Sequence, residues 1–298
     1  MEKKFSEIQT VAVHDGVFHA DDVLCVALIN VLCKKTVEVI RSRDEDRLNQ
    51  ADIICDIGLG EFDHHDKDEA QKERYENGVM YAACGKVARA MVNDPDVDIT
   101  QEELDMLLMK ALYAVQAFDN GQDTKKDDIP NYPNPFSFIS TFNNLQSYGG
   151  VYAPLQDGLF ANATAVAETV LCNVLDQIRE ELSSKKMLQD CIINRYNHII
   201  IMETFIRGWQ NDVVAFNDQH LNDMILMVVY PGRGSQWNIQ VVPKNNDPAD
   251  HEAWVGNIAG KTENLPGHVF TAHGFMAGFE TKEQAIDAAR LITEWSHV

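Results

Sequence analysis

Residues 10–33 read TVAVHDGVFHADDVLCVALINVLC and decide the fold of the first part of the chain. Residues 10–13 are a short apolar run that ends at His14, a pattern typical of a buried strand. Residues 21–33 begin with a pair of aspartates and are otherwise apolar nearly all round, which favours a buried helix. This stretch therefore predicts a strand and a helix joined by a polar turn.

Two further short strands are predicted downstream, at residues 37–40 (VEVI) and 52–55 (DIIC). A strand, a helix and two more strands in such short order are typical of a parallel α/β sheet. His14 and Asp56 then fall just past the carboxyl ends of their strands. Because the loops at that edge of an open α/β sheet converge on a crevice, we expect a ligand site there.

The middle of the chain is predicted to be helical, with one long irregular excursion. Residues 78–92 have helical patterning, and Thr100 with Glu103 forms a capping box before a helix that ends near Asp119. Residues 121–160 are rich in Asp, Pro, Asn and Gly, which is typical of a lid or binding loop.

A second long helix is predicted over residues 161–193. Its apolar stripe consists of Val166, Val170, Val174, Ile178 and Leu182. Beyond it, apolar runs alternate with turns and a closing helix follows at about 282–296, which predicts a smaller α/β domain.

The length and composition fit a folded protein with two domains. The chain has 298 residues, of which 45% are hydrophobic. It has no run of eighteen apolar residues and no apolar signal core near its start, so we expect neither a membrane span nor secretion. The six cysteines are scattered without a CxxC pair, as expected for reduced thiols in the cytoplasm.

The net charge is −21, from 46 acidic and 25 basic residues. Such a surface repels polyanions at long range, which argues against a broad nucleic-acid-binding face. A short anionic substrate held by local cations and metal stays compatible with it. Solubility alone accounts for most of these charges.

The turn after the first strand places His14, His19 and Asp21 in the pattern His-x4-His-x-Asp. Such a turn can present all three side chains to one point as nitrogen and oxygen ligands. Mixed His and Asp ligands without cysteine suit manganese, magnesium or zinc, and the oxygen-rich mixture favours manganese. The alternative is that one histidine caps the helix and the others are solvated.

A second polar cluster follows Asp56, in the sequence Phe62-Asp63-His64-His65. Adjacent histidines project differently and rarely satisfy a core together. In one interpretation His64 binds a metal, Asp63 orients it, and His65 faces a substrate phosphate. The alternative is a solvated polar turn.

Asp119 lies at the end of a predicted helix, where the helix dipole disfavours a negative charge, so a cation should lie nearby. A turn-forming aspartate is the simple alternative. Combined, the candidates can hold two divalent ions, with Asp56 as a bridge, in a site that activates water against a phosphoester. The predicted metal ligands are His14, His19, Asp21, Asp56, His64 and Asp119.

Four segments, HDGVFHADD, ICDIG, FDHH and AFDNG, resemble the metal motifs of the DHH phosphoesterase superfamily. The sequence contains no GxSxG, Walker A or Rossmann glycine pattern that supports another class. The HxGxFHxD start, AxDNG, RGSxW and GHVF segments are similar to the melanocyte-proliferating-gene (Myg) family within it. That resemblance implies a metal-dependent hydrolase with RNA exonuclease activity.

The sequence departs from the superfamily pattern at two points. His19 takes the place of the first aspartate of the usual His-x3-Asp-x-Asp motif, with one residue inserted, and the glycine-rich GGGH signature is missing. By resemblance the C-terminal part recognises substrate, with Arg233 on phosphate oxygens and Trp237 either stacking a base or packing in the core. The substrate-binding candidates are Arg233, Gly234, Ser235, Trp237, Lys261 and His268.

Together these features predict an α/β enzyme with its active site in a cleft between two domains. We expect a DHH-type metal-binding catalytic domain at 1–160, a connecting helix at 161–196 and a substrate-recognition domain at 197–298. The predicted activity is hydrolysis of short single-stranded RNA or oligonucleotides from one end, with two Mn²⁺ or Mg²⁺ ions and with Asp63 and His65 as catalytic residues. A phosphatase for pyrophosphate or a nucleotide and a non-catalytic metal-binding module are the alternatives, and a homodimer stays open.

Overall fold

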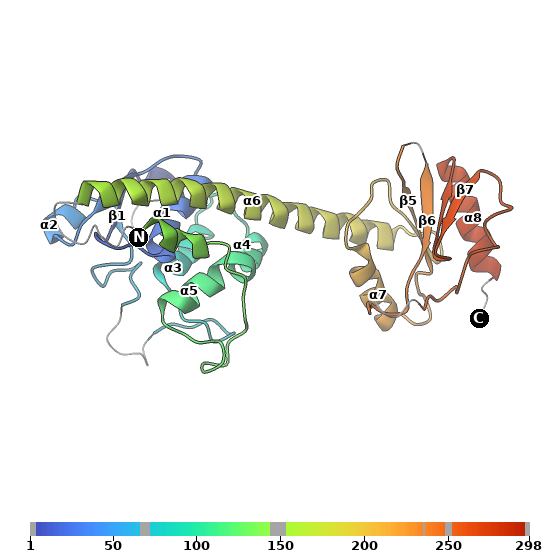
Figure 1. Cartoon of the computed structure of the whole chain (residues 1–298), viewed down its shortest axis with the longest axis horizontal. Helices are drawn as coiled ribbons and strands as arrows, with labels where there is room; N and C mark the ends of the chain where they lie inside the picture. Colours follow the sequence, from blue (N-terminus) through green and yellow to red (C-terminus); the bar gives the residue numbers. More distant parts are fainter. Residues whose placement is uncertain (1–3, 66–71, 144–152, 235, 248–251, 296–298) are drawn as a thin grey trace. The chain divides into compact units, whose positions relative to one another are not determined.

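The computed structural model describes residues 4–65, 72–143, 153–234, 236–247 and 252–295 (Figure 1). The chain divides into two compact units, Met1–Arg179 and Glu180–Val298. The boundary between them falls inside one long helix. The active site between two domains stays a prediction.

The first unit contains a three-stranded parallel sheet of order β2-β1-β3. The strands are β1 (Thr10–Val13), β2 (Glu38–Arg41) and β3 (Ile53–Ile54). The central β1 is buried from Val11 onward, which explains its purely apolar run. The parallel sheet predicted from the sequence is thereby confirmed, and its carboxyl edge carries the residues that follow each strand.

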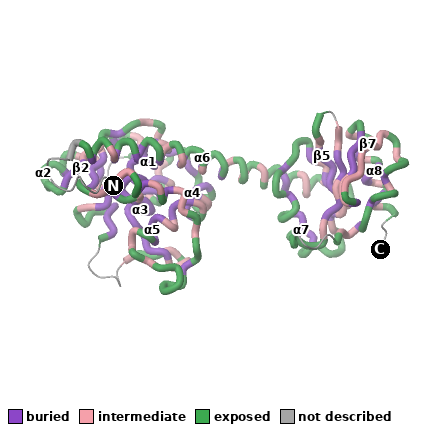
Figure 2. The backbone as a smooth tube through the Cα atoms, in the orientation of Figure 1, coloured by how far each residue is buried: buried purple, intermediate pink, exposed green. Residues whose placement is uncertain are grey.

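Helix α1 (Ala20–Leu32) follows β1 and is buried along almost its whole length. It contacts α3 (Ala83–Met91) and α5 (Tyr113–Asp119), so apolar side chains are needed all round it. Figure 2 shows this helix among the buried parts of the unit. The remaining short elements of the unit are η1 (Phe5–Glu7), α2 (Glu45–Leu48) and η4 (Ser137–Phe142).

One continuous helical segment leads to Asp119. It begins with α4 (Gln101–Leu107), passes through a π-helical turn (Leu108–Leu112), and ends with α5. The predicted capping box is confirmed, because Thr100 Oγ1 accepts from the amide of Glu103 and the Glu103 carboxylate accepts from the amide of Thr100. Turns of π-helix are frequent at functional sites, and this one precedes the helix that carries Asp119.

The long helix α6 runs from Ala153 to Ile193. The predicted start at residue 161 is therefore wrong. Of the predicted stripe, Ile178 is buried, Val170, Val174 and Leu182 are half-buried, and Val166 is 41% exposed. Small alanines let α6 approach the first unit closely, and Glu168 accepts a 2.6 Å hydrogen bond from Asn30 of α1. The stripe that packs inward is Ala163, Ala167, Leu171, Leu175 and Ile178.

By length and composition alone, the span Leu155–Ile193 of α6 could cross a membrane. Core helices of soluble proteins pass the same test, and a third of its apolar window (33%) is buried within the protein.

The second unit contains a five-stranded sheet of order β4-β5-β6-β8-β7, parallel between β4 and β5 and antiparallel elsewhere. Its strands are β4 (Ile199–Ile201), β5 (Met227–Pro231), β6 (Trp237–Val241), β7 (His268–Ala272) and β8 (Met276–Phe279). Two apolar clusters lie in this unit. One contains α8 (Lys282–Trp295) residues such as Ala289, and the other contains α7 (Trp209–Gln219) residues such as Val213.

The sequence did not reveal α7 or the separation of β7 from β8. His273 and Gly274 have φ values of +53° and +76°, which form a tight turn between the two strands. In the sequence HVFTAHGFMAGF (268–279), Gly274 is the local signal for this turn. Helix α7 is short of apolar periodicity and contributes few buried side chains.

Candidate metal centre

Two ligand candidates sit where neighbouring strands end. His14 follows β1 and Asp56 follows β3, and these strands are paired. Asp56 has a φ of +58°, in the left-handed region that non-glycine residues seldom adopt, and its amide donates a 2.9 Å hydrogen bond to the carbonyl of Phe62. Such backbone strain persists where surrounding structure holds it and often aims a functional side chain.

The first group of possible ligands is His14, Asp22 and Asp56, all buried. Nε2 of His14 lies 3.4 Å from Oδ2 of Asp22 and 3.5 Å from Oδ2 of Asp56. Nδ1 of His14 lies 3.0 Å from the carbonyl oxygen of Asp15. A proton on Nδ1 would be donated to that carbonyl, which leaves Nε2 as the ligand atom.

Asp22 is the ligand candidate that sequence reasoning missed. Its Oδ1 accepts from the amides of His19 (2.8 Å) and Val23 (3.1 Å), the capping role that the sequence predicts for the Asp pair. Its Oδ2 instead faces His14. The sequence does contain a signal for Asp22. Asp21 and Asp22 are adjacent, and one carboxylate is enough to cap a helix, so the other is available as a ligand.

The second group is Asp21, Asp56, His64 and Asp119, which come from separate segments. Nε2 of His64 lies 2.9 Å from Oδ2 of Asp119, 3.0 Å from Oδ1 of Asp56 and 3.8 Å from Oδ2 of Asp21. A third, overlapping group joins Asp56 and His64 to the exposed His65. Three of the predicted ligands therefore surround His64.

Asp56 belongs to each of these groups. Its Oδ2 faces His14, whereas its Oδ1 faces His64. A carboxylate with one oxygen toward each group is suited to bridge two cations. The predicted bridging position of Asp56 thus has the matching geometry.

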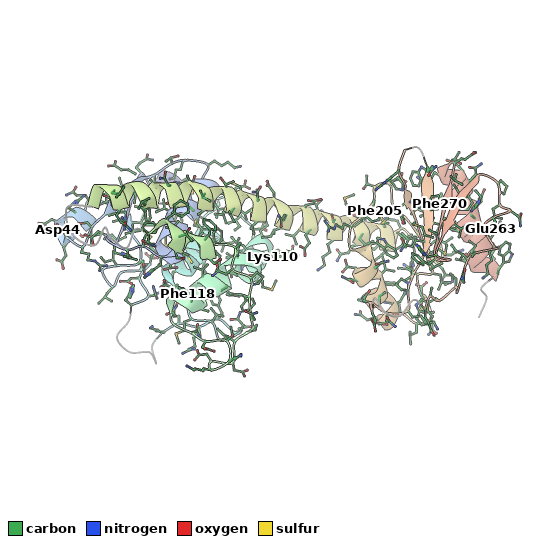
Figure 3. All side chains as sticks on the ribbon, viewed as in Figure 1. Asp44, Lys110, Phe118, Phe205, Glu263 and Phe270 are labelled. Carbon is green, nitrogen blue, oxygen red and sulfur yellow. The ribbon has the colours of Figure 1, made fainter. Side chains whose placement is uncertain are left out.

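Asp119 is delivered by the last turn of α5. The neighbouring Phe118, which is labelled in Figure 3, is exposed to 77%, whereas the side chain of Asp119 is only 7% exposed. Burial opposes ionisation of Asp119, but His19 and His64 outweigh it and hold the pKa of this carboxyl well below its usual range.

His19 lies at the rim of the site. Its Nδ1 is 3.4 Å from Oδ1 of Asp119, and its side chain is 55% exposed. Within the described ranges it joins none of the three groups of possible ligands. The structure thus brings together five of the six predicted ligands and leaves His19 beside them.

Asn120 orients the ring of His64. Oδ1 of Asn120 lies 3.4 Å from Nδ1 of His64, and its amide group donates to the carbonyls of Gln116 (3.0 Å) and Tyr81 (3.1 Å). The amide orientation is thereby fixed, so Oδ1 is the atom that faces the imidazole. This leaves Nε2 of His64 directed at the carboxylates.

Asp63 pairs with His65, so its predicted role in orienting His64 is wrong. Oδ1 of Asp63 lies 2.7 Å from Nδ1 of His65, and the amide of Leu59 donates a 2.6 Å hydrogen bond to Oδ2. Burial opposes ionisation of Asp63, but these donors hold its pKa well below the usual range. The hydrogen bond to Asp63 in turn raises the pKa of His65.

Asp21 is held by the N-terminus of α3. The amides of Ala83 and Cys84 each donate a 2.9 Å hydrogen bond to its carboxylate, which favours the ionised form. Burial acts in the opposite direction and, with the charges of Asp56 and Asp119, raises the pKa of Asp21 to about 7. The carboxylate is thus positioned before any ligand arrives.

Protons compensate the crowded negative charge. Burial lowers the pKa of both buried histidines, but the nearby carboxylates raise it to about 9 for His14 and about 10 for His64. Burial and the charge of Asp56 raise the pKa of Asp22 to about 6. A site that attracts protons this strongly also attracts divalent cations.

The buried polar atoms fit a metal. Among the residues that the structure describes, Asp22 Oδ2, Asp56 Oδ1 and His64 Nε2 are buried and make no well-formed hydrogen bond, although ion-pair partners lie 3.4, 3.0 and 2.9 Å away. Buried polar atoms are normally paired, and an unpaired one is costly. All three belong to the possible ligand groups, so cations bound by these groups would satisfy them.

A pocket of about 570 Å³, here called the metal pocket, opens beside these groups. His65 lies at this pocket with its side chain 57% exposed. The pocket is lined by His14, Asp15, Gly16, Val17, His19, Arg43, Asp56, Ile57, Gly58, Leu59, Asp63 and His65.

Most of the predicted substrate-binding residues of the second unit are exposed or make hydrogen bonds within that unit. Arg233 and Gly234 are exposed in the turn between β5 and β6, and Ser235 lies outside the described residues. Nε2 of His268 lies 2.8 Å from Oγ1 of Thr271, and Nζ of Lys261 donates to the carbonyl of Val255 at 3.5 Å.

Trp237 is partly buried and packs against the core of the second unit. It lies against the apolar cluster that contains Phe279, its register partner on β8. Nζ of Lys282 lies 5.2 Å from the centroid of its ring. This is the structural alternative to base stacking.

A family model described as an uncharacterised protein family (UPF0160, MYG1_exonuc) matches residues 10–292. The chain belongs to this family. It is 22% identical over 320 residues to the MYG1 exonuclease of Mus musculus, which covers 94% of this chain and 83% of that protein. It is 25% identical over 323 residues to a MYG1 protein of Schizosaccharomyces pombe, with 94% and 96% covered.

The similarity to MYG1 proteins extends to bacteria. A MYG1 protein of Chlamydia muridarum is 23% identical over 297 residues, with 95% of this chain and 96% of that protein covered. The crystal structure of an exopolyphosphatase-related protein from Bacteroides fragilis aligns with 98% of this chain and 94% of that chain, at 12% identity. Its TM-score of 0.22 is too low to support an argument.

Proposed function

We propose that this MYG1-family chain is a metal-dependent phosphoester hydrolase of the DHH superfamily. We further propose that it is an exonuclease that acts on short single-stranded RNA or oligonucleotides. The observation that carries the proposal is the position of Asp56, whose two oxygens face two separate groups of histidine and carboxylate ligands. Relatives that share most of the chain are named MYG1 exonuclease.

The donor set suits Mn²⁺ or Mg²⁺, because carboxylate oxygens outnumber imidazole nitrogens and none of the grouped ligands is a cysteine. His14, Asp22 and Asp56 would hold one ion, and Asp21, Asp56, His64 and Asp119 the other. When bound, the pair supplies Lewis acidity that activates water and stabilises negative charge on a phosphoryl group.

The protein's own residues orient these ligands and meet the substrate. The carbonyl of Asp15 and the amide oxygen of Asn120 fix the two ligating imidazoles. Asp63 turns His65 so that Nε2 is the ring nitrogen left for a phosphate oxygen, and it favours the protonated ring that can donate there. In the second unit, we propose that the exposed Arg233 contributes to substrate recognition.

The test is release of mononucleotide from a 5′- or 3′-labelled RNA oligonucleotide by the manganese-loaded full chain. We expect stepwise shortening from one end and loss of turnover in His64→Ala. A parallel reaction with pyrophosphate separates a nuclease from a small-molecule phosphatase. Full metal loading without hydrolysis of any of these phosphoesters or anhydrides would contradict the proposal.

A further inference from the structure

The loop after β2, the other neighbour of the central strand β1, also contributes a side chain to the metal pocket. This strand ends at Arg41, and Arg43 lines the metal pocket two residues later. The carboxyl ends of β1, β2 and β3 thus supply His14, Arg43 and Asp56 to one edge of the sheet. That edge is where parallel α/β sheets bind ligands.

Arg41 and Arg43 differ sharply in their surroundings. The side chain of Arg41 is 3% exposed, and its guanidinium donates to the carbonyl of Gly16 (2.7 Å) and to the carboxylate of Asp157 (2.9 Å). It ties the turn after β1 to α6 and is therefore structural. The side chain of Arg43 is 64% exposed and faces the metal pocket instead.

Arg43 stands out by charge. Among the described residues that line the metal pocket it is the one lysine or arginine, whereas Asp15, Asp56 and Asp63 supply negative charge there. An anionic substrate that enters this pocket meets carboxylates on several sides. A guanidinium at the wall offsets that repulsion and presents a planar fork that matches phosphate oxygens.

Asp15 holds the guanidinium of Arg43 at the pocket. Nε of Arg43 lies 3.1 Å from Oδ1 of Asp15, whose own side chain is 51% exposed. Because both partners are largely exposed, this ion pair contributes little stability and is easily exchanged. The contact occupies one of the five N–H donors of the guanidinium, so the Nη groups can reach a ligand.

We propose that Arg43 binds a phosphate group of the substrate and so sets the affinity of the metal pocket for phosphoesters. This inference rests on the proposed phosphoester hydrolase function. Arg43 exchanges the exposed carboxylate of Asp15 for phosphate oxygens when substrate enters. Asp15 thereby has two roles, since its carbonyl orients His14 and its carboxylate positions Arg43.

The test measures phosphate binding directly. Inorganic phosphate is titrated calorimetrically into the manganese-loaded full chain, and hydrolysis of a labelled oligonucleotide is followed in parallel. We expect Arg43→Gln to weaken phosphate binding and to raise KM on the order of 10- to 100-fold, because a charged hydrogen-bond donor is lost. Arg43→Lys keeps the charge without the fork, so its affinity should fall between wild type and Arg43→Gln.

Arg47→Gln is the matched control, because Arg47 is exposed on α2 nearby but does not line the metal pocket. It should bind phosphate like the wild type, and all variants should keep the metal content and unfolding temperature of the wild type. If Arg43→Gln binds phosphate as tightly as wild type, the role of Arg43 is overturned and the hydrolase function stands. If the metal-loaded wild type neither binds phosphate nor hydrolyses phosphoesters, the proposed function falls and this inference with it.

Discussion

In the first unit, the possible metal ligands are buried charged groups held by neighbours, whereas in the second unit Arg233 and Gly234 are exposed at a turn. Burying Asp21 and His64 without a counter-charge is costly, so the protein needs several hydrogen bonds and a cation to keep them there. An exposed arginine has no such cost. Buried charge is therefore strong evidence for a site, whereas the exposed charge of Arg233 in its turn is weak evidence. The exposed Arg43 carries more weight because it lines the metal pocket.

The largest effect is expected where the two ligand groups meet. Asp56→Asn keeps the size of the side chain but removes the charge and one of the two oxygens that face the groups. We expect turnover to fall on the order of 10³-fold, which corresponds to about 4 kcal/mol in the activation barrier. Metal content, measured by mass spectrometry, should fall below two ions per chain.

Asp46→Asn is the control for that prediction, because Asp46 is exposed on α2 and makes the same change of charge away from the pocket. If Asp56→Asn still binds two ions and keeps the wild-type turnover, the buried ligands of the first unit matter no more than the exposed residues of the second unit. Asp56 would then not be a bridging carboxylate.

A smaller effect is expected from the residue that orients His64. Asn120→Ala removes the acceptor for Nδ1 of His64 and the donors to Gln116 and Tyr81. Loss of such supporting contacts typically lowers metal affinity or activity by about 10- to 100-fold. Asn93→Ala, at the exposed end of α3, should leave metal affinity unchanged in the same titration.

The pH dependence of manganese binding tests whether His14 and His64 are metal ligands. In the metal-free protein the pKa is about 9 for His14 and about 10 for His64, above the ordinary value of 6.5. Proton binding therefore stabilises the metal-free fold at low pH, and this contribution is lost as the pH rises through about 9 and about 10. Metal must displace these protons, so manganese affinity should rise with pH.

Calorimetry in buffers of different ionisation enthalpy would count the protons released. We expect release at pH 7 and little release above about pH 10, once both histidines are neutral. Affinity that does not change between pH 7 and pH 10 would place the histidines outside the metal-binding groups.

The smallest effect on the metal centre is expected from the second unit. Trp237→Ala should lower the free energy of unfolding by about 2 kcal/mol, because the ring packs against the core cluster. The loss is smaller than for a fully buried tryptophan, because the side chain is partly exposed. Metal content should stay unchanged. An unchanged unfolding free energy, together with a rise in KM for oligonucleotides but not for pyrophosphate, would instead support base stacking.

Much of the first unit could be predicted from the sequence, because short apolar strands and the capping box at Thr100 are local signals. His14 and Asp56 were found because they follow parallel strands whose carboxyl ends converge on one edge. His64 was found because two adjacent histidines rarely satisfy a core together. Asp22 was missed because its helix-capping role already explained it. Asp63 was paired with the wrong histidine, since adjacent rings point in directions that spacing does not reveal.

We propose that the carboxylate of Asp56 bridges two metal ions. Low-temperature electron paramagnetic resonance of the manganese-loaded protein tests it most directly. Two ions about 3.5–4 Å apart should show a spin-coupled multiline spectrum at two manganese per chain. A six-line spectrum of isolated manganese, or saturation at one ion per chain, would contradict the account.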